Sequence, residues 1–251
     1  AAREISLRDV KEIKKHLPDM EIEIFVHGSM CFAYSGRCLV SAVQMGRVPN
    51  RGSCANDCRF EYTLYAANED HSTLFRLEEE PGVGTYIFNA KDMNLASHVD
   101  EILESGAVDS IKIEGRTKSP YYAAVTAYAY RSAIDDFYAQ KFDASKYQHE
   151  LATTKNRGFT DAYLIHRPFE KNDTQNHEYA LSTGSYEVSG LVTDDEEHFM
   201  CKYKTYPNEE TEIFAPLNSI IKECENEIGK IYKKEDGKYY ISFKKILTES
   251  G

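Results

Sequence analysis

The stretch SIKIEGRTKSP, residues 110–120, holds a predicted strand, a charged turn and a helix start in succession. Its first four residues are predicted to form a strand. Ser119 and Pro120 are a strong helix start, since serine caps the first N–H groups and proline fits the first turn. The charged turn Glu114-Gly115-Arg116 is therefore expected at the exit of a strand, just before a long helix.

A strand and a helix are also predicted nearer the N-terminus. Ser6 begins a helix in a capping box with Asp9, and Pro18 stops it. Residues 21–26, EIEIFV, alternate and then become wholly apolar, as a strand does on entering a core. Residues 1–5 are expected to be the end of a further strand.

Residues 92–104 are predicted to be one more helix, with apolar side chains on one side and Gly106 as its stop. Alternating strands and helices are typical of parallel β/α units. Three or four units are present, whereas a full (β/α)₈ barrel needs eight and about 250 residues. The predicted fold class is α/β, with a partial, half TIM-type β/α barrel: either a fragment of a barrel or an open α/β layer.

Two regions depart from this alternation. A short helix at 37–45 and a loop precede three strand candidates that predict a small β insertion: 60–67, 74–77 and 85–88. Beyond residue 170, short β-like runs predict a small all-β, barrel-like module: 186–192, 198–204, 211–215 and 239–243. Residues 219–234 fit either a helix or a pair of strands. The predicted organisation is 1–169 for the β/α part, 170–182 for a linker and 183–251 for the β module.

The net charge of −11 counts against a free-standing nucleic-acid-binding protein, which is usually basic, although it leaves room for a local basic groove. No apolar run approaches the roughly 18 residues that a membrane helix needs. The first residues, Ala1 to Arg8, are already charged and do not resemble a secretory signal. A soluble, cytoplasmic protein with no membrane partner is expected.

Four of the six cysteines lie within a short stretch, with the spacing C-x₆-C-x₁₅-C-x₃-C: Cys31, Cys38, Cys54 and Cys58. Thiolates are soft ligands, and four of them suit zinc or an iron–sulfur cluster. The irregular spacing favours an iron–sulfur cluster over a zinc ribbon. The alternative to metal binding is that the four cysteines are unrelated and simply buried. Cys201 and Cys224 lie on β-like runs and are expected to be core residues.

Charged residues near strand ends are the other candidates for a site. Arg37, Arg47, Arg51 and Arg59 surround the cysteines and could offset thiolate charge, meet an anionic substrate, or simply be solvated. Glu114 and His27 each follow a strand, at the edge that carries the chemistry in β/α folds. Basic side chains that could contact an anion are Lys112, Arg116 and Lys118. The alternative is that these residues serve only the fold, as a buried ion pair and a packed histidine. The patch Asn156-Arg157-Gly158 is either a binding edge or a plain loop.

These residues resemble the signature of a known family. Glu23-x-Phe25-x-x-Gly28-Ser29-Met30-Cys31, followed by Tyr34-Ser35-Gly36-Arg37-Cys38-x-x-Ser41, is similar to peptidase family U32, the collagenase-like proteins. Ile113 to Ser119 and Asn156-Arg157-Gly158 resemble further stretches of that family. The resemblance covers roughly residues 1–165, and more weakly the β module. Full-length members begin with more β/α units, which supports the fragment interpretation.

The resemblance implies two activities. Some members are associated with metal-dependent collagen degradation, and close relatives form 5-hydroxyuridine at the tRNA wobble position, with prephenate as a linked metabolite. In those relatives matching cysteines hold a 4Fe–4S cluster, which here implies Cys31, Cys38, Cys54 and Cys58 as ligands.

The tRNA-modifying enzyme is the preferred hypothesis, because neither G-x-S-x-G nor H-E-x-x-H is present. Expected catalytic residues are Glu114, His27 and Arg116; expected substrate-binding residues are Lys112, Lys118, Arg37, Asn156 and Arg157. The expected partners are tRNA and a small anionic metabolite. A peptidase acting on collagen or gelatin, and a non-catalytic module with a zinc clamp, remain alternatives; the oligomeric state is not predicted.

Overall fold

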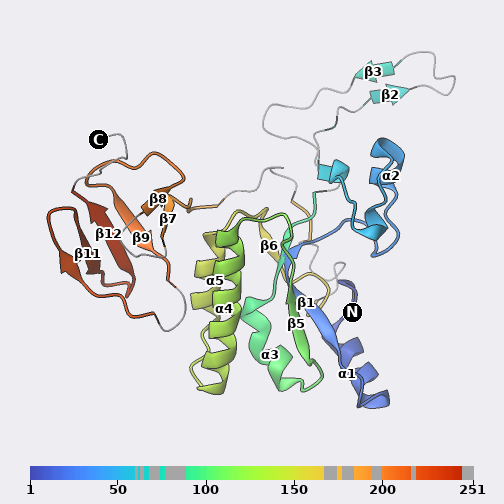
Figure 1. Ribbon diagram of the computed structural model, residues 1–251. Coiled ribbons are helices and arrows are strands. Elements are labelled where there is room, and N and C mark those ends of the chain that lie inside the picture. The colour runs from blue at the N-terminus through green and yellow to red at the C-terminus, as the bar shows by residue number, and fades with distance from the viewer. Residues whose placement is uncertain are drawn as a thin grey trace. The chain divides into compact units, whose positions relative to one another are not determined.

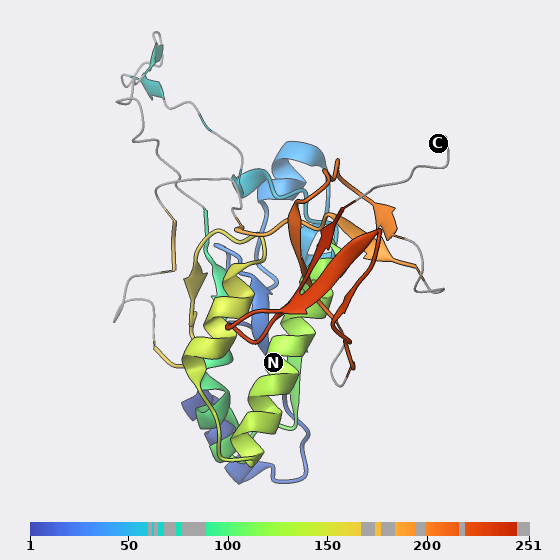
Figure 2. The same cartoon turned by 90° about the vertical axis from the view of Figure 1, so that its left-hand side faces the viewer.

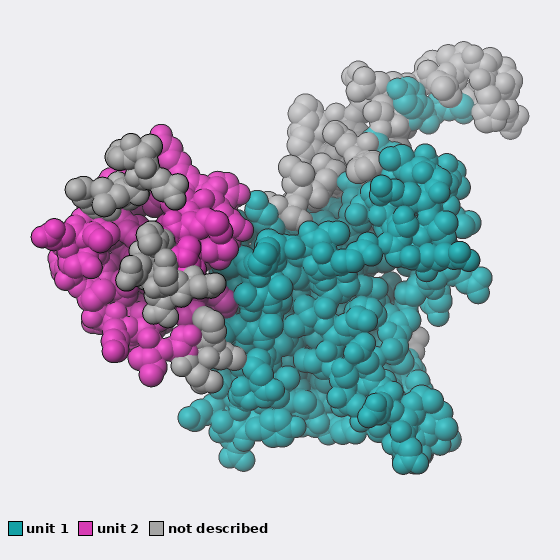
Figure 3. Space-filling model, in the orientation of Figure 1, with its two compact units in different colours: residues 1–185 teal, residues 186–251 magenta. Residues whose placement is uncertain are grey.

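The computed structural model describes residues 1–59, 62, 65–67, 74–76, 89–166, 174–176, 184–193, 199–215 and 219–244. Contacts divide the chain into two compact units, Ala1–Ser185 and Tyr186–Gly251, coloured separately in Figure 3. The strand predicted at 85–88, and most of the linker predicted at 170–182, fall outside the described residues. Among the described helices, none has the length and apolar character needed to cross a membrane.

The first unit is built on a four-stranded sheet in the order β5-β1-β4-β6 (Figure 1). The strands are β1 (Glu23–Ser29), β4 (Asp92–Asn94), β5 (Ser110–Ile113) and β6 (Phe159–Thr160). β1 and β5 are parallel, β4 and β6 are parallel, but β1 and β4 are antiparallel. The α/β class is confirmed, whereas β4, antiparallel to β1, departs from the predicted parallel β/α units.

The helix predicted over 92–104 is also wrong in its first part. It begins with strand β4 and continues as a 3₁₀ turn, η3 (Ala96–His98), before helix α3 (Val99–Glu104). All three residues of β4 are buried, and they are held by distant strands rather than by local helical hydrogen bonds. Local periodicity cannot show such pairing. Residues 1–5, expected to end a strand, are not a strand either.

Helices α1 (Leu7–His16) and α4 (Pro120–Tyr138) begin at the predicted caps. The Ser6 hydroxyl accepts the Asp9 N–H at 3.1 Å, and the Asp9 carboxylate accepts the Ser6 N–H at 3.2 Å. The Ser119 hydroxyl accepts the Tyr122 N–H at 3.2 Å. Helix α5 (Ala144–Ala152), which was not predicted, packs beside α4 (Figure 2).

Tyr130 of α4 fastens this helix to the sheet. It is fully buried, and its hydroxyl donates to the Val26 carbonyl at 2.7 Å and accepts the Leu95 N–H at 3.0 Å. Apolar side chains from the sheet and helices complete the core around it: Ile24, Val26, Met93, Leu95, Ile102, Tyr147 and Leu151. This core fixes β1 and β4, which carry the site residues.

The cysteine-rich segment and the predicted insertion follow β1. The segment holds α2 (Val40–Met45) and two 3₁₀ turns, η1 (Pro49–Arg51) and η2 (Asp57–Arg59). In the insertion, β2 (Tyr65–Ala67) pairs antiparallel with β3 (Leu74–Arg76). The short helix is thus present, although it begins at Val40 rather than at residue 37, and two of the three expected strands are present in the described residues.

The described residues of the second unit contain strands and no helix, as expected. β7 (Gly190–Val192) pairs with β8 (Phe199–Cys201), and a second sheet has the order β10-β11-β12-β9. The latter strands are β9 (Glu210–Ile213), β10 (Cys224–Glu225), β11 (Gly229–Lys233) and β12 (Tyr239–Phe243). Residues 219–234 therefore supply a pair of strands, not a helix. Cys201 and Cys224 are exposed, so their prediction as core residues is wrong. Closure into a barrel stays a prediction.

Candidate functional site

The mixed sheet gathers charged residues at one of its edges. Because β1 and β4 are antiparallel, with His27 opposite Asn94 and Ser29 opposite Asp92, the end of β1 meets the start of β4. β5 ends at the same edge, where the Glu114 N–H donates to the His27 carbonyl at 2.9 Å. β6 begins there, with Asp92 opposite Phe159. The predicted candidates at the strand ends and in the separate patch at 156–158 therefore belong to one edge.

Gly28 allows β1 and the turn after β5 to come this close. Its φ is +122°, and a Cβ at this position would lie 2.4 Å from the Glu114 carbonyl oxygen. Only glycine combines that backbone conformation with that approach. Gly28 thus fixes where the Glu114 turn lies.

An ion pair between Asp92 and Arg157 is buried at this edge. Both side chains are 5% exposed, and the Arg157 Nε–H also donates to the Ala90 carbonyl at 3.1 Å. Burial lowers the pKa of Arg157, Asp92 opposes this, and Arg59 and Cys58 act on it as well. Arg157 therefore lies within electrostatic range of the cysteine segment. Asp92 was missed because the sequence placed it in a helix.

Lys118 is half-buried in the same region. Its ammonium donates to the Lys155 carbonyl at 3.3 Å and lies 5.3 Å from the centre of the Tyr122 ring. Burial lowers its pKa, while Asp92 and Glu114 raise it and Arg157 and Arg59 lower it further. A partly desolvated cation among these charges is suited to hold an anionic group.

Glu114 is held by its own turn and by α4. The Tyr122 hydroxyl donates to the Glu114 carbonyl at 2.9 Å, and one carboxylate oxygen accepts the Arg116 N–H at 3.3 Å. Burial raises the pKa of Tyr122, with smaller contributions from Asp92 and Glu114, so this phenol stays protonated. The sequence identified Tyr122 only as part of a predicted helix and not as a site residue.

His27 is enclosed by aromatic rings. The ring centres of Tyr122, Tyr130 and Phe159 lie 5.8, 5.6 and 5.6 Å from that of the imidazole. Burial lowers the pKa of His27 to about 3; nearby Lys118 also lowers it, and a hydrogen bond with Asn94 opposes the shift. The imidazole is therefore uncharged near neutral pH.

The remaining predicted residues have different surroundings. The Arg116 guanidinium donates to the Gly52 carbonyl at 2.9 Å, which ties the Glu114 turn to the cysteine segment. Lys112 faces Glu23 at 3.5 Å, and no contact joins it to Glu114 or Lys118 in the described part of the chain. Asn156 shapes a turn: its side chain donates to the Thr154 carbonyl at 2.8 Å and accepts the Gly158 N–H at 2.9 Å. Arg37 is exposed.

The four clustered cysteines are free thiols, and two of them, Cys31 and Cys58, are affected by their neighbours. Burial raises the pKa of Cys31, and Cys38 and Cys54 add to this; burial likewise raises the pKa of Cys58, with added effects of the other three thiols. The donor set is chemically suited to zinc or an iron–sulfur cluster. Over the residues that the structure describes, however, no three Cys, His, Asp or Glu side chains are already arranged around a metal position.

Asp57, beside Cys58, is an unexpected feature of this segment. The residue is 1% exposed, and neither carboxylate oxygen has a hydrogen-bond partner among the described residues. A buried carboxylate without a donor or a cation is costly in free energy. Nothing in the sequence marked this aspartate.

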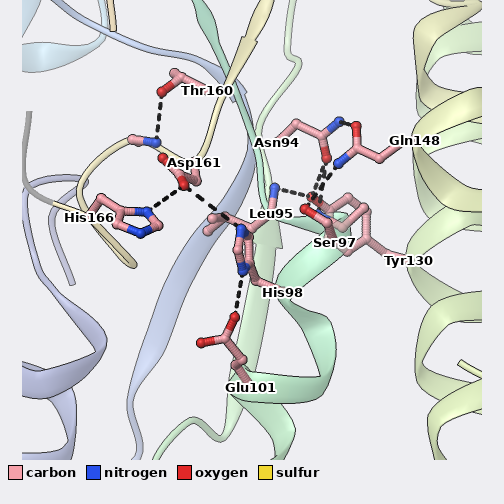
Figure 4. Close-up of polar contacts among 12 residues, drawn as sticks. Asn94, Leu95, Ser97, His98, Glu101, Tyr130, Gln148, Thr160, Asp161 and His166 are labelled. Carbon is pink, nitrogen blue, oxygen red and sulfur yellow. Dashed lines mark hydrogen bonds and ion pairs between the residues drawn. The ribbon is translucent and has the colours of Figure 1, made fainter. Parts of the chain in front are cut away.

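A second polar cluster lies at the opposite edge of the sheet, after β4 and β6 (Figure 4). The buried Asp161 carboxylate lies 2.8 Å from Nδ1 of His166 and 3.8 Å from Nε2 of His98. His98 also pairs with Glu101 at 2.6 Å. These contacts join the turn after β6 to η3 and α3, so we assign them to the fold.

The geometry defines an α/β protein whose charged sheet edge adjoins a segment with four thiols. The model of peptidase family U32 matches residues 1–174, and the chain belongs to this family. It is 59% identical over 249 residues to tRNA hydroxylation protein P of Helicobacter pylori (strain J99 / ATCC 700824), covering 99% of this chain and 59% of that protein.

More distant relatives carry two kinds of name. tRNA hydroxylation protein P of Escherichia coli (strain K12) is 37% identical over 274 aligned positions, covering 91% of this chain and 60% of that protein. A protein named Collagenase from Porphyromonas gingivalis (strain ATCC BAA-308 / W83) is 30% identical over 177 positions, covering 65% of this chain and 41% of that protein. The chain thus spans about three fifths of the length of the relatives named for tRNA hydroxylation. No solved structure matches it.

Proposed function

We propose that this chain is part of a cytoplasmic enzyme that hydroxylates the wobble uridine of tRNA. The observation that carries the proposal is the 59% identity, over 249 residues, to a protein named for tRNA hydroxylation. The charged edge beside four thiols supplies the groups that such a reaction needs: anion-binding cations, a carboxylate and a ligand set for a redox cofactor.

Within this proposal, Lys118 and Arg116 hold the carboxylate of a small metabolite of the prephenate class. Lys118 is the better-placed cation, because it is partly desolvated and lies in the field of Asp92 and Glu114. Arg157 is paired with Asp92, and because this ion pair adds no net charge, we assign the anion to Lys118 and Arg116. Arg116 is anchored on Gly52 and positions the Glu114 turn.

Proton transfer falls to Glu114 rather than to His27. An imidazole with a pKa of about 3 is uncharged near neutrality and has no proton to give as a cation. His27 instead packs as a neutral spacer under the edge, while the Glu114 turn is fixed by Gly28 and Tyr122. Asn156 shapes the turn that presents Arg157.

The proposed cofactor is a 4Fe–4S cluster on Cys31, Cys38, Cys54 and Cys58, which would supply electron transfer. The effect of the neighbouring thiols on the pKa of Cys31 and Cys58 supports this ligand set. Asp57 is the observation that favours the alternative, a zinc ion, because an unpartnered carboxylate suits a divalent cation better than an anionic cluster.

Anaerobic purification followed by iron, sulfide, zinc and absorption measurements separates the two. Cys54→Ser should lower metal content, and Cys201→Ser, at an exposed cysteine of the second unit, should not.

We further propose that the first unit is part of a β/α barrel completed by other segments of a longer protein. The parallel pair β1–β5 and the long helix α4 support this, and the antiparallel β4 is a local departure from it. A structure of the full-length protein that lacks a closed barrel would overturn this point.

A collagenase-like peptidase is the second candidate, supported by the relative named Collagenase at 30% identity. Protease-free protein should leave gelatin intact if the first proposal is right.

The direct test of hydroxylation is mass spectrometry of tRNA nucleosides from cells lacking this gene and its relatives. 5-Hydroxyuridine derivatives should vanish and return with the wild-type gene; their persistence in the deletion strain would refute the proposal.

A further inference from the structure

The segment between β1 and η2 has an unusual charge for this chain. Residues 24–56 contain three arginines, Arg37, Arg47 and Arg51, and no aspartate or glutamate, although Asp and Glu number 41 in a chain of net charge −11. All three arginines are exposed. Their side chains make no ion pair or hydrogen bond with any described residue. Positive charge is therefore free here while the rest of the molecule is acidic.

Large apolar and aromatic side chains are exposed on the same segment. Tyr34 is 66% exposed, and Leu39, Val43 and Met45, on and beside α2, are 66%, 82% and 58% exposed. Two arginines flank this short helix: Arg37 precedes it, and Arg47 follows its C-terminal cap, Gly46. An exposed ring next to unpaired arginines is the combination that binds single-stranded nucleic acid, where phosphates meet cations and bases stack on rings.

The segment is anchored to the site rather than loose. The Ala55 N–H donates to the buried Ser41 hydroxyl at 3.1 Å, which closes the loop onto α2. The Arg116 guanidinium donates to the Gly52 carbonyl at 2.9 Å, next to Arg51. The arginines thus lie on a segment that contacts the Glu114 turn directly.

We infer that residues 32–51 form a docking surface for the single-stranded loop of an RNA, the anticodon loop if the proposed function holds. Arg37, Arg47 and Arg51 contact phosphates, and Tyr34 stacks on a base. The acidic remainder of the chain repels RNA, so contact is directed to this segment and toward the Glu114 edge. A protein partner is the competing occupant. One carboxylate lies beside the surface, Glu4, which accepts the N–H and the hydroxyl of Ser35 at 2.9 Å. Residues 24–56 themselves contain three arginines and no acid, and this excess of positive charge favours a polyanion.

Binding of an RNA hairpin with an anticodon stem–loop sequence to the full-length protein tests this inference. The triple variant R37Q/R47Q/R51Q should bind at least about tenfold more weakly, and the slope of log K against log salt should fall by about 2, since each single-strand phosphate contact contributes about 0.7. The matched control R8Q/K11Q/K15Q removes the same charge from exposed positions of α1 and should bind as wild type. Tyr34→Ala should weaken binding by about tenfold, and Tyr34→Phe, which keeps the ring, by no more than about twofold.

The outcomes separate this surface from the proposed function. Unchanged affinity and salt slope in the triple variant, with wild-type protein still binding the hairpin, overturn the surface and leave the function standing. Loss of metal content in the triple variant also overturns it, because the arginines would then serve the thiolates. Loss of association with another protein, with RNA binding intact, overturns it in favour of the protein partner. If wild-type protein binds no tRNA at all, the proposed function fails together with the surface.

Discussion

At the scale of single residues, the site depends on how closely two turns approach. Gly28 places β1 against the carbonyl of Glu114, with no room for a side chain and with a backbone that other residues rarely adopt. The position of the proposed proton carrier is therefore set by a residue that takes no part in chemistry.

Gly28→Ala is expected to lower the free energy of unfolding by about 3 kcal/mol, because it adds both a backbone strain and a clash. Gly106→Ala is the matched control: its φ is also positive, at +60°, but nothing lies within 4 Å of the added Cβ. In that variant the free energy of unfolding should fall by only about 1 kcal/mol. Urea denaturation measures both, and equal losses would contradict the close approach.

His27 makes stability depend on pH. The unfolded chain takes up a proton on this histidine below its ordinary pKa of 6.5, whereas the folded chain does so only near 3. Stability contributed by the neutral imidazole is therefore complete above pH 6.5 and is lost as the pH falls toward 3. The loss attributable to His27 between pH 7 and pH 5 should be about 2 kcal/mol.

His27→Gln should flatten the pH dependence by that amount, even if the variant is less stable at every pH. His16→Gln, at an exposed histidine of α1, should keep the wild-type slope. Denaturation series at pH 7, 6 and 5 provide the measurement. A wild-type slope in His27→Gln would show that the buried imidazole is not the group that titrates.

Several site residues could be predicted from the sequence because they follow strands. His27 and Glu114 lie at one edge, as expected. The four cysteines remain a predicted ligand set. Asp92, Tyr122 and Asp57 could not be predicted, since their roles depend on burial and on contacts between distant segments. The sequence also could not show that Lys112 faces Glu23.

At the scale of elements, the decisive feature is the antiparallel strand β4. It carries Asp92 to the edge where Arg157 precedes β6, and the two form a buried ion pair. Strand β1, helices α1 and α4 and their caps were predictable from local patterns, because capping and periodicity are local properties. Three-residue β4 and two-residue β6 were not, because only pairing with other strands makes them strands.

Removing one partner of the buried pair leaves an uncompensated charge. Arg157→Met should therefore lower the free energy of unfolding by about 3–5 kcal/mol, and adding Asp92→Leu should recover much of it. Arg131→Met breaks the exposed pair with Asp135 on α4 and should have little measurable effect. If Arg157→Met and Arg131→Met are equally mild, the pair does not hold β4 to β6.

At the scale of the whole molecule, the chain combines two units of different character. The first carries the charged edge and the thiols, and the second, in its described residues, is built of strands. The two units divide between Ser185 and Tyr186, and the linker expected over residues 170–182 stays a prediction. The antiparallel pairing of β4 with β1 could not be predicted from the sequence, and this topology assembles the site.

Under the proposed function, tRNA is hydroxylated at the edge that carries Glu114. In a strain lacking this gene and its relatives, full-length protein with Glu114→Gln should fold and keep wild-type metal content, yet restore less than about a tenth of the 5-hydroxyuridine derivatives measured by nucleoside mass spectrometry. The same change at Glu104, exposed on α3, should restore them fully. Full restoration by Glu114→Gln would show that this carboxylate is not needed for the proposed hydroxylation.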